Sequence, residues 1–288
     1  MIYSFFTFLL VTILFAIANS GCGKNLITVL FHPSVEERFT TSLSGKLTQP
    51  TPIRVANQNF FQFAMFGDVQ IQSENKNTLT QFKTDVTSRN IDFFVVLGDL
   101  TEDGTTDEFT KIKADLDSVG IPYYATIGNH DLFQQGSSGG WGTWQSTFGP
   151  ATYSVTVAQA VRFIFLDSAS GDIGPSQFSW LETQLKTSTP FTIVGTHYPI
   201  YDGFTPLIWR LASTEERYKL TDLLMKYQVT AYVAGHIHGY KENKIGSVNH
   251  LITGSMFPYT LDYGNPSYAL FTYDHGNLSW QQILLPSQ

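Results

Sequence analysis

Cysteine and clustered basic residues are scarce in this chain, and each scarcity excludes a class of protein. One cysteine among 288 residues excludes an intrachain disulfide framework. No long run of lysine or arginine is present, and the formal net charge is -7. Because proteins that bind polymeric DNA or RNA need a basic surface, we expect no polymeric nucleic acid among the partners.

The N-terminus also lacks a basic residue, since no lysine or arginine precedes Lys24. Residues 2–18 are almost wholly apolar, and small or polar residues follow as far as Cys22. This arrangement is typical of an export signal with its cleavage region, although such signals usually begin with a positive charge. A run of about 17–20 apolar residues can also span a bilayer as an anchor. We therefore expect an exported protein, either secreted after cleavage or attached to a membrane through residues 1–22.

Cys22 has two interpretations. Ser20-Gly21-Cys22 resembles the end of a bacterial lipoprotein box, in which the cysteine is acylated and becomes the mature N-terminus. Asn19 stands where that pattern prefers an aliphatic residue, so the match is partial. Alternatively, Cys22 is a lone free cysteine in a segment that is removed or has no fixed structure. Membrane attachment is thus expected only through residues 1–22 or an acylated Cys22.

The rest of the chain divides into a polar arm and one larger domain. Residues 40–58 are rich in Thr, Ser, Pro, Gln and Asn, so residues 23–59 are interpreted as an arm or linker, with a short strand at residues 25–31. The hydrophobic content of 42% supports one substantial core, and we place the domain at residues 60–288.

Within this domain, apolar runs alternate with segments of helical spacing, and short strand-like runs come last. The predicted strands are residues 61–66, 92–97, 122–127, 161–166, 191–194, 229–234, 250–253, 268–273 and 278–284. The predicted helices are residues 78–89, 106–119, 175–185 and 215–227. Alternation followed by strands predicts an α/β fold with two sheets in the core and helices outside, an α/β/β/α sandwich.

One segment of the domain is predicted to be a long loop. Residues 134–149 are rich in Gly and Ser but carry Trp141, Trp144 and Phe148. Since this segment closely follows a polar motif, it either forms part of a substrate wall or is held to the core by its aromatic rings. The same two interpretations apply to the aromatic residues of the segment 198–204.

Five short polar motifs recur in a fixed order, each directly after an apolar run. They are Gly67-Asp68-Val69-Gln70, Gly98-Asp99, Gly128-Asn129-His130-Asp131, Gly195-Thr196-His197 and Gly235-His236-Ile237-His238. Oxygen ligands and imidazoles that five strand ends deliver to one sheet edge suit a hydrolytic site with two metal ions.

In this order the motifs resemble those of the calcineurin-like metallophosphoesterase superfamily, from about residue 60 to the C-terminus. The Gly-Asn-His-Asp and Gly-His-x-His motifs are the specific ones, and four of the seven histidines fall within the set. The resemblance implies a hydrolase of phosphate mono- or diesters, in which a hydroxide that bridges two metal ions attacks phosphorus. It implies divalent or mixed-valence ions among Mn, Fe, Zn and Mg, and a phosphorylated small molecule or other phosphoester as substrate.

The resemblance also implies a role for each motif residue. The first ion would be held by Asp68, by Gln70 and by His238, the second by Asn129, His197 and His236, and Asp99 would bridge both. His130 would lie beside the substrate phosphate, where it protonates the leaving oxygen or stabilises developing charge. Asp131 would hold the other ring nitrogen of His130; its alternative role, a helix N-cap or turn residue, is compatible with that one.

Gln70 is the departure from the family pattern, which usually has Asp-x-His at this place. An amide oxygen is a hard but neutral ligand, so Gln70 binds the ion directly or holds a metal-bound water, and the first site is expected to be the weaker one. Purple acid phosphatases have a tyrosine where Glu102 stands, so we expect neither that subclass nor its colour. Gln70 is also the feature that favours an alternative, a non-catalytic exported or surface-attached binding protein that retains the fold.

Overall fold

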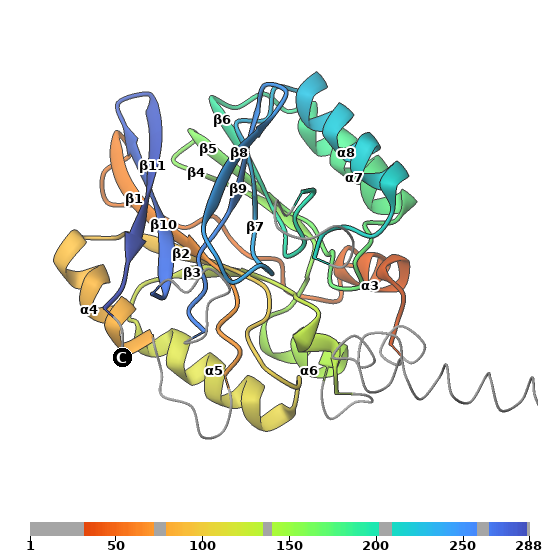
Figure 1. The fold of residues 1–288 in the computed structure, drawn as a ribbon, viewed down its shortest axis with the longest axis horizontal. Coiled ribbons are helices and arrows are strands. Elements are labelled where there is room, and N and C mark those ends of the chain that lie inside the picture. The colour runs from red at the N-terminus through yellow and green to blue at the C-terminus, as the bar shows by residue number, and fades with distance from the viewer. Residues whose placement is uncertain (1–31, 72–78, 135–139, 202–208, 258–264, 287–288) are drawn as a thin grey trace, which may run out of the picture.

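The computed structural model describes residues 32–71, 79–134, 140–201, 209–257 and 265–286. Two sheets lie in its core and helices cover their outer faces (Figure 1). The first sheet has the strand order β11-β10-β1-β2-β3, and the second has the order β4-β5-β6-β7-β9-β8. This arrangement confirms the predicted two-sheet α/β sandwich.

The elements agree closely with the strong periodicities of the sequence. The strands of the first sheet are β1 (Phe60–Phe66), β2 (Phe93–Leu97), β3 (Tyr123–Thr126), β10 (Ser267–Asp274) and β11 (Asn277–Leu284). Those of the second are β4 (Tyr153–Val157), β5 (Val161–Phe165), β6 (Phe191–Gly195), β7 (Ala231–Ala234), β8 (Lys241–Ile245) and β9 (Val248–Ile252). The helices are α3 (Val35–Ser42), α4 (Leu79–Arg89), α5 (Thr106–Ser118), α6 (Gly140–Thr147), α7 (Pro175–Leu185) and α8 (Thr214–Lys226), with a 3₁₀ turn η1 (His130–Leu132). Strands β4 and β8 were not predicted.

Aromatic side chains join the two sheets. Because successive side chains of a strand point to opposite faces, Phe63 of β1 faces the second sheet, whereas Phe66 faces the helices. The Phe63 ring stacks on Phe271 with centroids 4.8 Å apart and meets Phe163 of β5 edge to face at 5.2 Å. Such pairs contribute about 0.5–1.5 kcal/mol each beyond the burial of their area. The inter-sheet layer is therefore a rigid base for the loops that leave it.

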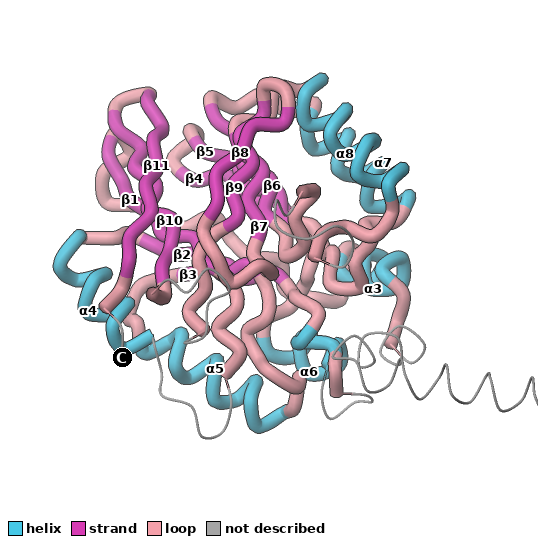
Figure 2. Tube along the Cα trace, viewed as in Figure 1, coloured by secondary structure: helices cyan, strands magenta, loops and turns pink. Residues whose placement is uncertain are grey.

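Helices form the two outer layers, as Figure 2 shows. Helices α4, α5 and α6 pack on the first sheet, and α7 and α8 pack on the second. Helix α6 corrects the prediction of a loop at residues 134–149. Trp144 is fully buried there, edge-on to Phe109 of α5, and Trp141 is buried beside it. Of the two interpretations of these aromatics, the structure shows packing on the core.

The N-terminal arm begins with a helix that was not predicted. Helix α3 has a capping box, in which Ser34 accepts the Glu37 N–H and Glu37 accepts the Ser34 N–H. Its apolar side chains Val35 and Phe39 are buried, and the helix contacts α7. The capping box followed by apolar residues four apart was the available signal for this helix.

No helix among the described residues is both long and apolar enough to cross a bilayer. The predicted export signal at residues 1–22, Cys22 and the strand predicted at residues 25–31 lie outside the described residues.

The parallel strands bring their carboxyl ends to one edge, where loops carry the polar motifs. Strands β1, β2 and β3 are parallel in the first sheet, and β5, β6, β7 and β9 are parallel in the second. The Gly67 segment after β1 pairs with Ser255 after β9, which joins the two sheets at this edge. In open α/β sheets, this edge is where ligands bind.

A buried histidine makes the stability of this fold sensitive to acid. His250 of β9 stacks on Tyr232 and accepts the Ile200 N–H at 3.2 Å, and burial lowers its pKa to about 4. In the unfolded chain this histidine binds a proton with a pKa of about 6.5, whereas in the folded chain it does so only near pH 4. Its contribution to the free energy of unfolding is therefore fully present above pH 6.5 and is lost as the pH falls toward 4. Between pH 7 and pH 5 this one group should remove about 2 kcal/mol from the free energy of unfolding.

We expect His250→Gln to reduce the difference in the free energy of unfolding between pH 7 and pH 5 by about 2 kcal/mol. Urea titrations at the two pH values measure it. His275→Gln, at an exposed histidine, is the matched control and should leave the difference unchanged. An equal pH response in wild type and His250→Gln would contradict the assignment.

Candidate metal centre

The loops at this edge hold the predicted ligands in an uncommon backbone conformation. Asp68, Gln70, Asp99, His236 and His238 have positive φ angles of 55°, 44°, 51°, 72° and 56°. This region is sparsely populated by residues other than glycine and costs about 1–3 kcal/mol each where a side chain is strained. Strain gathered on five of the seven predicted ligands favours a functional explanation over a structural one.

Three of the predicted ligands converge around an imidazole nitrogen of a fourth, His197. His197 Nε2 lies 3.0 Å from Asn129 Oδ1, 3.0 Å from His236 Nδ1 and 3.2 Å from Asp99 Oδ2. Ligand atoms of Asp99, His197 and His236 all lie within 4.8 Å of one another. This mixture of nitrogen and oxygen donors, brought together from four loops, is typical of a site for a transition-metal ion.

The ligands predicted for the other ion lie next to this cluster. His238 Nε2 is 3.5 Å from Asp68 Oδ1, and the Asp68 carboxylate accepts the His236 N–H at 2.9 Å. Gln70 Oε1 is buried and has no hydrogen-bond partner within the described part of the chain. An orphaned buried oxygen costs about 1–3 kcal/mol, which a bound cation would offset. The donor types present therefore fit metal ions, and the orphaned oxygen of Gln70 is available to a cation or to a water bound to one.

A backbone carbonyl orients the central imidazole. His197 Nδ1 donates to the Leu97 carbonyl oxygen at 2.9 Å, so Nε2 is the nitrogen that could bind a cation once it loses its proton. This contact needs glycine beside it, since a Cβ on Gly98 would lie 2.6 Å from His197 Nδ1. A Cβ on Gly128 would lie 2.2 Å from Asp99 Oδ1. Both glycines therefore make room for the ligands.

Two buried carboxylates dominate the electrostatics of the centre. Burial raises the pKa of Asp68, although the charges of His238 and His197 oppose this. Burial also disfavours ionisation of Asp99, but His197 and His130 outweigh it and hold the pKa of Asp99 below its usual range. Such charges need a positive partner away from water, and a metal ion supplies one.

The imidazoles divide into one that binds a proton tightly and one that does not. Burial disfavours the charged ring of His197, yet Asp99 and then Asp68 raise its pKa to about 9. Burial and the charge of His197 lower the pKa of His236, which is therefore neutral. A cation entering the cluster would replace the proton on His197, because metal ligands must be deprotonated.

His130 lies at the rim of the cluster. Its side chain is 22% exposed, and its Nε2 is 4.0 Å from Asp99 Oδ2. Its backbone N–H donates to Asp99 Oδ1 at 2.9 Å, which ties η1 to the ligand. Burial lowers the pKa of His130, but Asp99 and the Glu102 carbonyl outweigh it and raise the pKa overall. The ring is therefore suited to be a proton donor facing the site.

Asp131 does not occupy the place expected for it. The Glu102 carbonyl oxygen, 2.7 Å away, contacts His130 Nδ1 instead. Asp131 is buried and accepts the N–H groups of Leu100 and Thr101 at 3.0 Å and that of Gly128 at 2.9 Å. Adjacent residues of a tight turn point in different directions, so Asp131 reaches back to the loop amides. It thereby joins the loop that carries Asp99 to the one that carries Asn129.

The sequence contained no sign of the two carbonyl groups, at Leu97 and Glu102, that orient histidine rings. Backbone carbonyls are present at every residue, so side-chain identity carries no such signal.

Comparison with known proteins identifies the family. The model of the calcineurin-like phosphoesterase family matches residues 61–240, more than half of the chain. This chain belongs to the calcineurin-like phosphoesterase family. The family comprises dinuclear metal enzymes that hydrolyse phosphoric esters, which agrees with the donor set described above.

Curated relatives include phosphatases and phosphodiesterases. A probable glycerophosphodiester phosphodiesterase of Arcobacter nitrofigilis is 30% identical over 51% of this chain and 56% of its own. A probable cyclic nucleotide phosphodiesterase of Rhodococcus erythropolis is 31% identical over 51% of each chain. The probable purple acid phosphatase 20 of Arabidopsis thaliana is 28% identical over 67% of this chain and 49% of its own. The chain thus spans about half the length of the curated relatives it matches.

Solved structures show the same fold. The purple acid phosphatase PPD1 of yellow lupin superposes with a TM-score of 0.63 at 19% identity, over 81% of this chain and 52% of that one. GAP50, the anchor in the inner membrane complex of Plasmodium, superposes with a TM-score of 0.61 at 17% identity, over 80% of this chain and 89% of that one.

We expect Gln70→Leu to weaken binding of the first metal ion by at least about tenfold and to leave the second ion bound, because Leu removes the side-chain amide that carries the orphaned oxygen. Manganese titration by calorimetry, with metal content measured by mass spectrometry, tests this. Gln281→Leu, an exposed position on β11, is the matched control. Two equally tight sites in Gln70→Leu would contradict the assignment.

Proposed function

We propose that this protein is an exported metal-dependent phosphoesterase that hydrolyses a phosphodiester or monoester by attack of a hydroxide held between two metal ions. The convergence of Asp99, Asn129, His197 and His236 from four loops carries this proposal, since only the edge shared by both sheets brings them together. The matching family and its relatives support hydrolysis of phosphoric esters.

Each motif residue would have one role in this reaction. One ion would be held by Asp68, Gln70 and His238. The other ion would be held by Asn129, His197 and His236, and Asp99 would contact both ions. When bound, the two ions supply Lewis acidity and lower the pKa of water, which provides a nucleophile at neutral pH. His130, at the rim, would hydrogen-bond a phosphoryl oxygen or donate a proton to the departing alcohol.

We infer that a diester is the preferred substrate class. The relatives with 30% and 31% identity are named as phosphodiesterases of glycerophosphodiesters and cyclic nucleotides. Glu102 stands where the purple acid phosphatases have a tyrosine. Both observations favour the phosphodiesterase branch over the purple acid phosphatases.

A non-catalytic binding protein is the second candidate. Gln70 favours it, and GAP50 shows that a protein described as an anchor has this fold. Gln70→His separates the two candidates. A wild-type protein without phosphoesterase activity that gains it in Gln70→His would support the binding protein, whereas an active wild type rejects it.

His130→Ala should lower kcat by about 10²- to 10⁴-fold, the usual range for loss of a general acid, while both metal ions stay bound. The backbone N–H that contacts Asp99 persists in this variant. Hydrolysis of bis(4-nitrophenyl) phosphate and 4-nitrophenyl phosphate by the manganese-loaded protein measures the loss, and metal content is measured on the same sample. The exposed His275→Ala is the matched control. Loss of metal in His130→Ala would refute the role given to it.

A further inference from the structure

A small cavity lies beside the predicted metal ligand Asn129. Its volume is about 180 Å³, and it is lined by residues 32–35 at the start of α3, by part of the loop 169–172 after β5, and by Asn129, Leu132 and Tyr198. We call it the arm pocket, because residues of the N-terminal arm form one of its walls. The motifs of the metal centre account for Asn129 alone among these residues.

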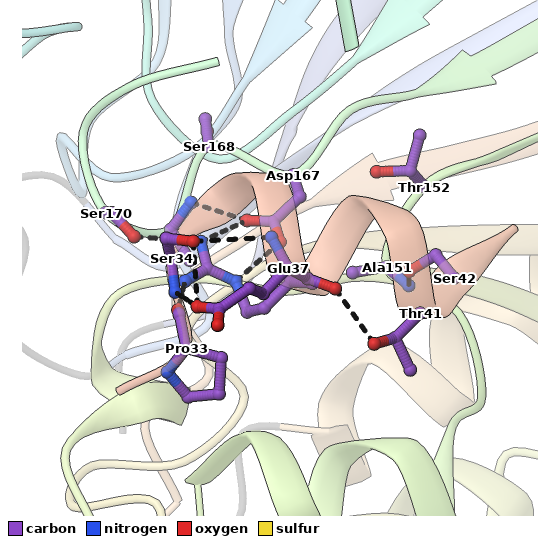
Figure 3. A network of polar contacts seen from close by, with 12 residues as sticks. Pro33, Ser34, Glu37, Thr41, Ser42, Ala151, Thr152, Asp167, Ser168 and Ser170 are labelled. Carbon is purple, nitrogen blue, oxygen red and sulfur yellow. Dashed lines mark hydrogen bonds and ion pairs between the residues drawn. The ribbon is translucent and has the colours of Figure 1, made fainter. Parts of the chain in front are cut away.

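One buried guanidinium holds both walls of the arm pocket. Arg38 donates to both carboxylate oxygens of Asp167, at 2.7 and 2.9 Å. It also donates to Ser170 Oγ at 2.8 Å and to the Pro33 carbonyl at 2.6 Å. Figure 3 shows Pro33, Asp167 and Ser170 gathered at the start of α3. A paired, bidentate guanidinium is a rigid link, so it fixes the distance between the arm and the loop.

Further contacts fix the same walls to the rest of the domain. Glu36 of α3 accepts the Ser176 N–H at the start of α7, at 3.0 Å. Ser168, next to Asp167, accepts the Tyr198 N–H at 2.9 Å, directly after the ligand His197. The arm pocket is therefore formed in advance and has a fixed position relative to the metal centre.

Two polar side chains of the arm pocket each have a buried atom without a hydrogen-bond partner in the described ranges. These atoms are Asp172 Oδ1 and His32 Nε2. Burial and then the Arg38 charge lower the pKa of His32, which is neutral. Burial and then the Glu216 carboxylate raise the pKa of Asp172, despite the opposing charge of Arg38. Arg38 is hydrogen-bonded to Asp167 and not to Asp172, so a cation entering the arm pocket would give Asp172 a direct partner.

The volume limits what the arm pocket can hold. A cavity of about 150 Å³ accommodates benzene, which has six non-hydrogen atoms. A cavity of about 180 Å³ therefore accommodates roughly six to eight such atoms, whereas a nucleoside has more than twice that number. The apolar side chains Val35, Leu132 and Ala169 suit the carbon atoms of such a group.

We propose that the arm pocket binds one of the two alcohol groups of the phosphodiester substrate. This alcohol is a small amino alcohol, and its ammonium group is directed to Asp172. The proposal rests on the proposed function. Arg38 is a positioning residue, because it acts through Pro33 and Ser170 rather than on the substrate.

Two synthetic diesters with the same 4-nitrophenolate leaving group test the proposal. The second alcohol is 2-aminoethanol in one ester and propan-1-ol in the other. The two esters therefore differ only at the end of this chain, which carries an ammonium group in the first and a methyl group in the second. For the manganese-loaded full chain we expect the KM of the aminoethyl ester to be about tenfold lower than that of the propyl ester. One charge-assisted hydrogen bond accounts for a difference of this size. In Asp172→Asn the KM values of the two esters should become equal, and kcat should change by less than about twofold. Asp222→Asn, an exposed aspartate on α8, is the matched control and should keep the preference.

The outcomes separate this proposal from the proposed function. Equal KM values for the two esters in the wild type would overturn the arm pocket as an amino-alcohol site and leave the phosphodiesterase intact. Hydrolysis of neither ester would contradict the phosphodiesterase. Calorimetric titration with ethanolamine then decides the pocket alone: binding by the wild type but not by Asp172→Asn supports it, and no binding by the wild type overturns it.

Arg38→Lys tests the positioning role, because an ammonium keeps the charge but cannot make the same set of bonds. It should lose the preference for the aminoethyl ester through KM and keep kcat for the propyl ester within about twofold. Ser170→Ala removes a single bond and serves if Arg38→Lys does not fold; it should lose part of the preference. An equal fall of kcat on both esters would show a general structural role and contradict positioning.

Discussion

The candidate site depends on one buried carboxylate, that of Asp99 at the end of β2. It is almost inaccessible to water, accepts the His130 N–H at 2.9 Å, and lies 3.2 Å from His197 Nε2. A charge in this position must be compensated by neighbouring groups. Its neighbours come from the loops after β3 and β6, so their conformations are tied to this one charge. The need to compensate Asp99 would therefore favour a proton or a cation at this edge.

A second buried carboxylate shows how differently the same residue type is used. Asp131 is bound by backbone N–H groups of two loops, and burial and then Asp99 raise its pKa to about 7. Asp99 faces the imidazoles and Asp131 faces the backbone, although both belong to neighbouring motifs that begin with glycine. The first organises charge and the second organises the loops. Sequence motifs identify both as important but do not distinguish these roles.

The fold was predictable where the spacing of apolar residues agrees with the residues that begin or end a helix or strand. Helix α7 was predicted with its observed bounds, and Pro175 lies in its first turn, where proline is favoured. Helix α6 was not, because its sequence is rich in Gly and Ser, and it is helical through burial of Trp141 and Trp144 against the core. Tertiary packing overrides local preference there.

The site was predictable as a set of residues and not as a set of contacts. The motifs predicted which side chains lie close together, because the carboxyl ends of parallel strands meet at one edge of the sheet. They did not foretell the carbonyl partners of His130 and His197. The Arg38–Asp167 pair joins residues 129 positions apart, and neither lies in a motif, so the arm had no recognisable link to the site.

The two halves of the centre differ in how far they are organised in advance. Around His197 Nε2, three donor atoms lie within 3.0–3.2 Å, whereas His238 and Asp68 are 3.5 Å apart and Gln70 Oε1 has no protein partner. The Asn129 side is thus fixed by contacts among its own side chains, whereas the Gln70 side has a buried oxygen that the described residues leave without a partner. The arm pocket opens beside Asn129, on the fixed side. Under the proposed function, the alcohol and the tightly held ion would therefore share one rigid wall, and the weaker ion would complete the site from the opposite side.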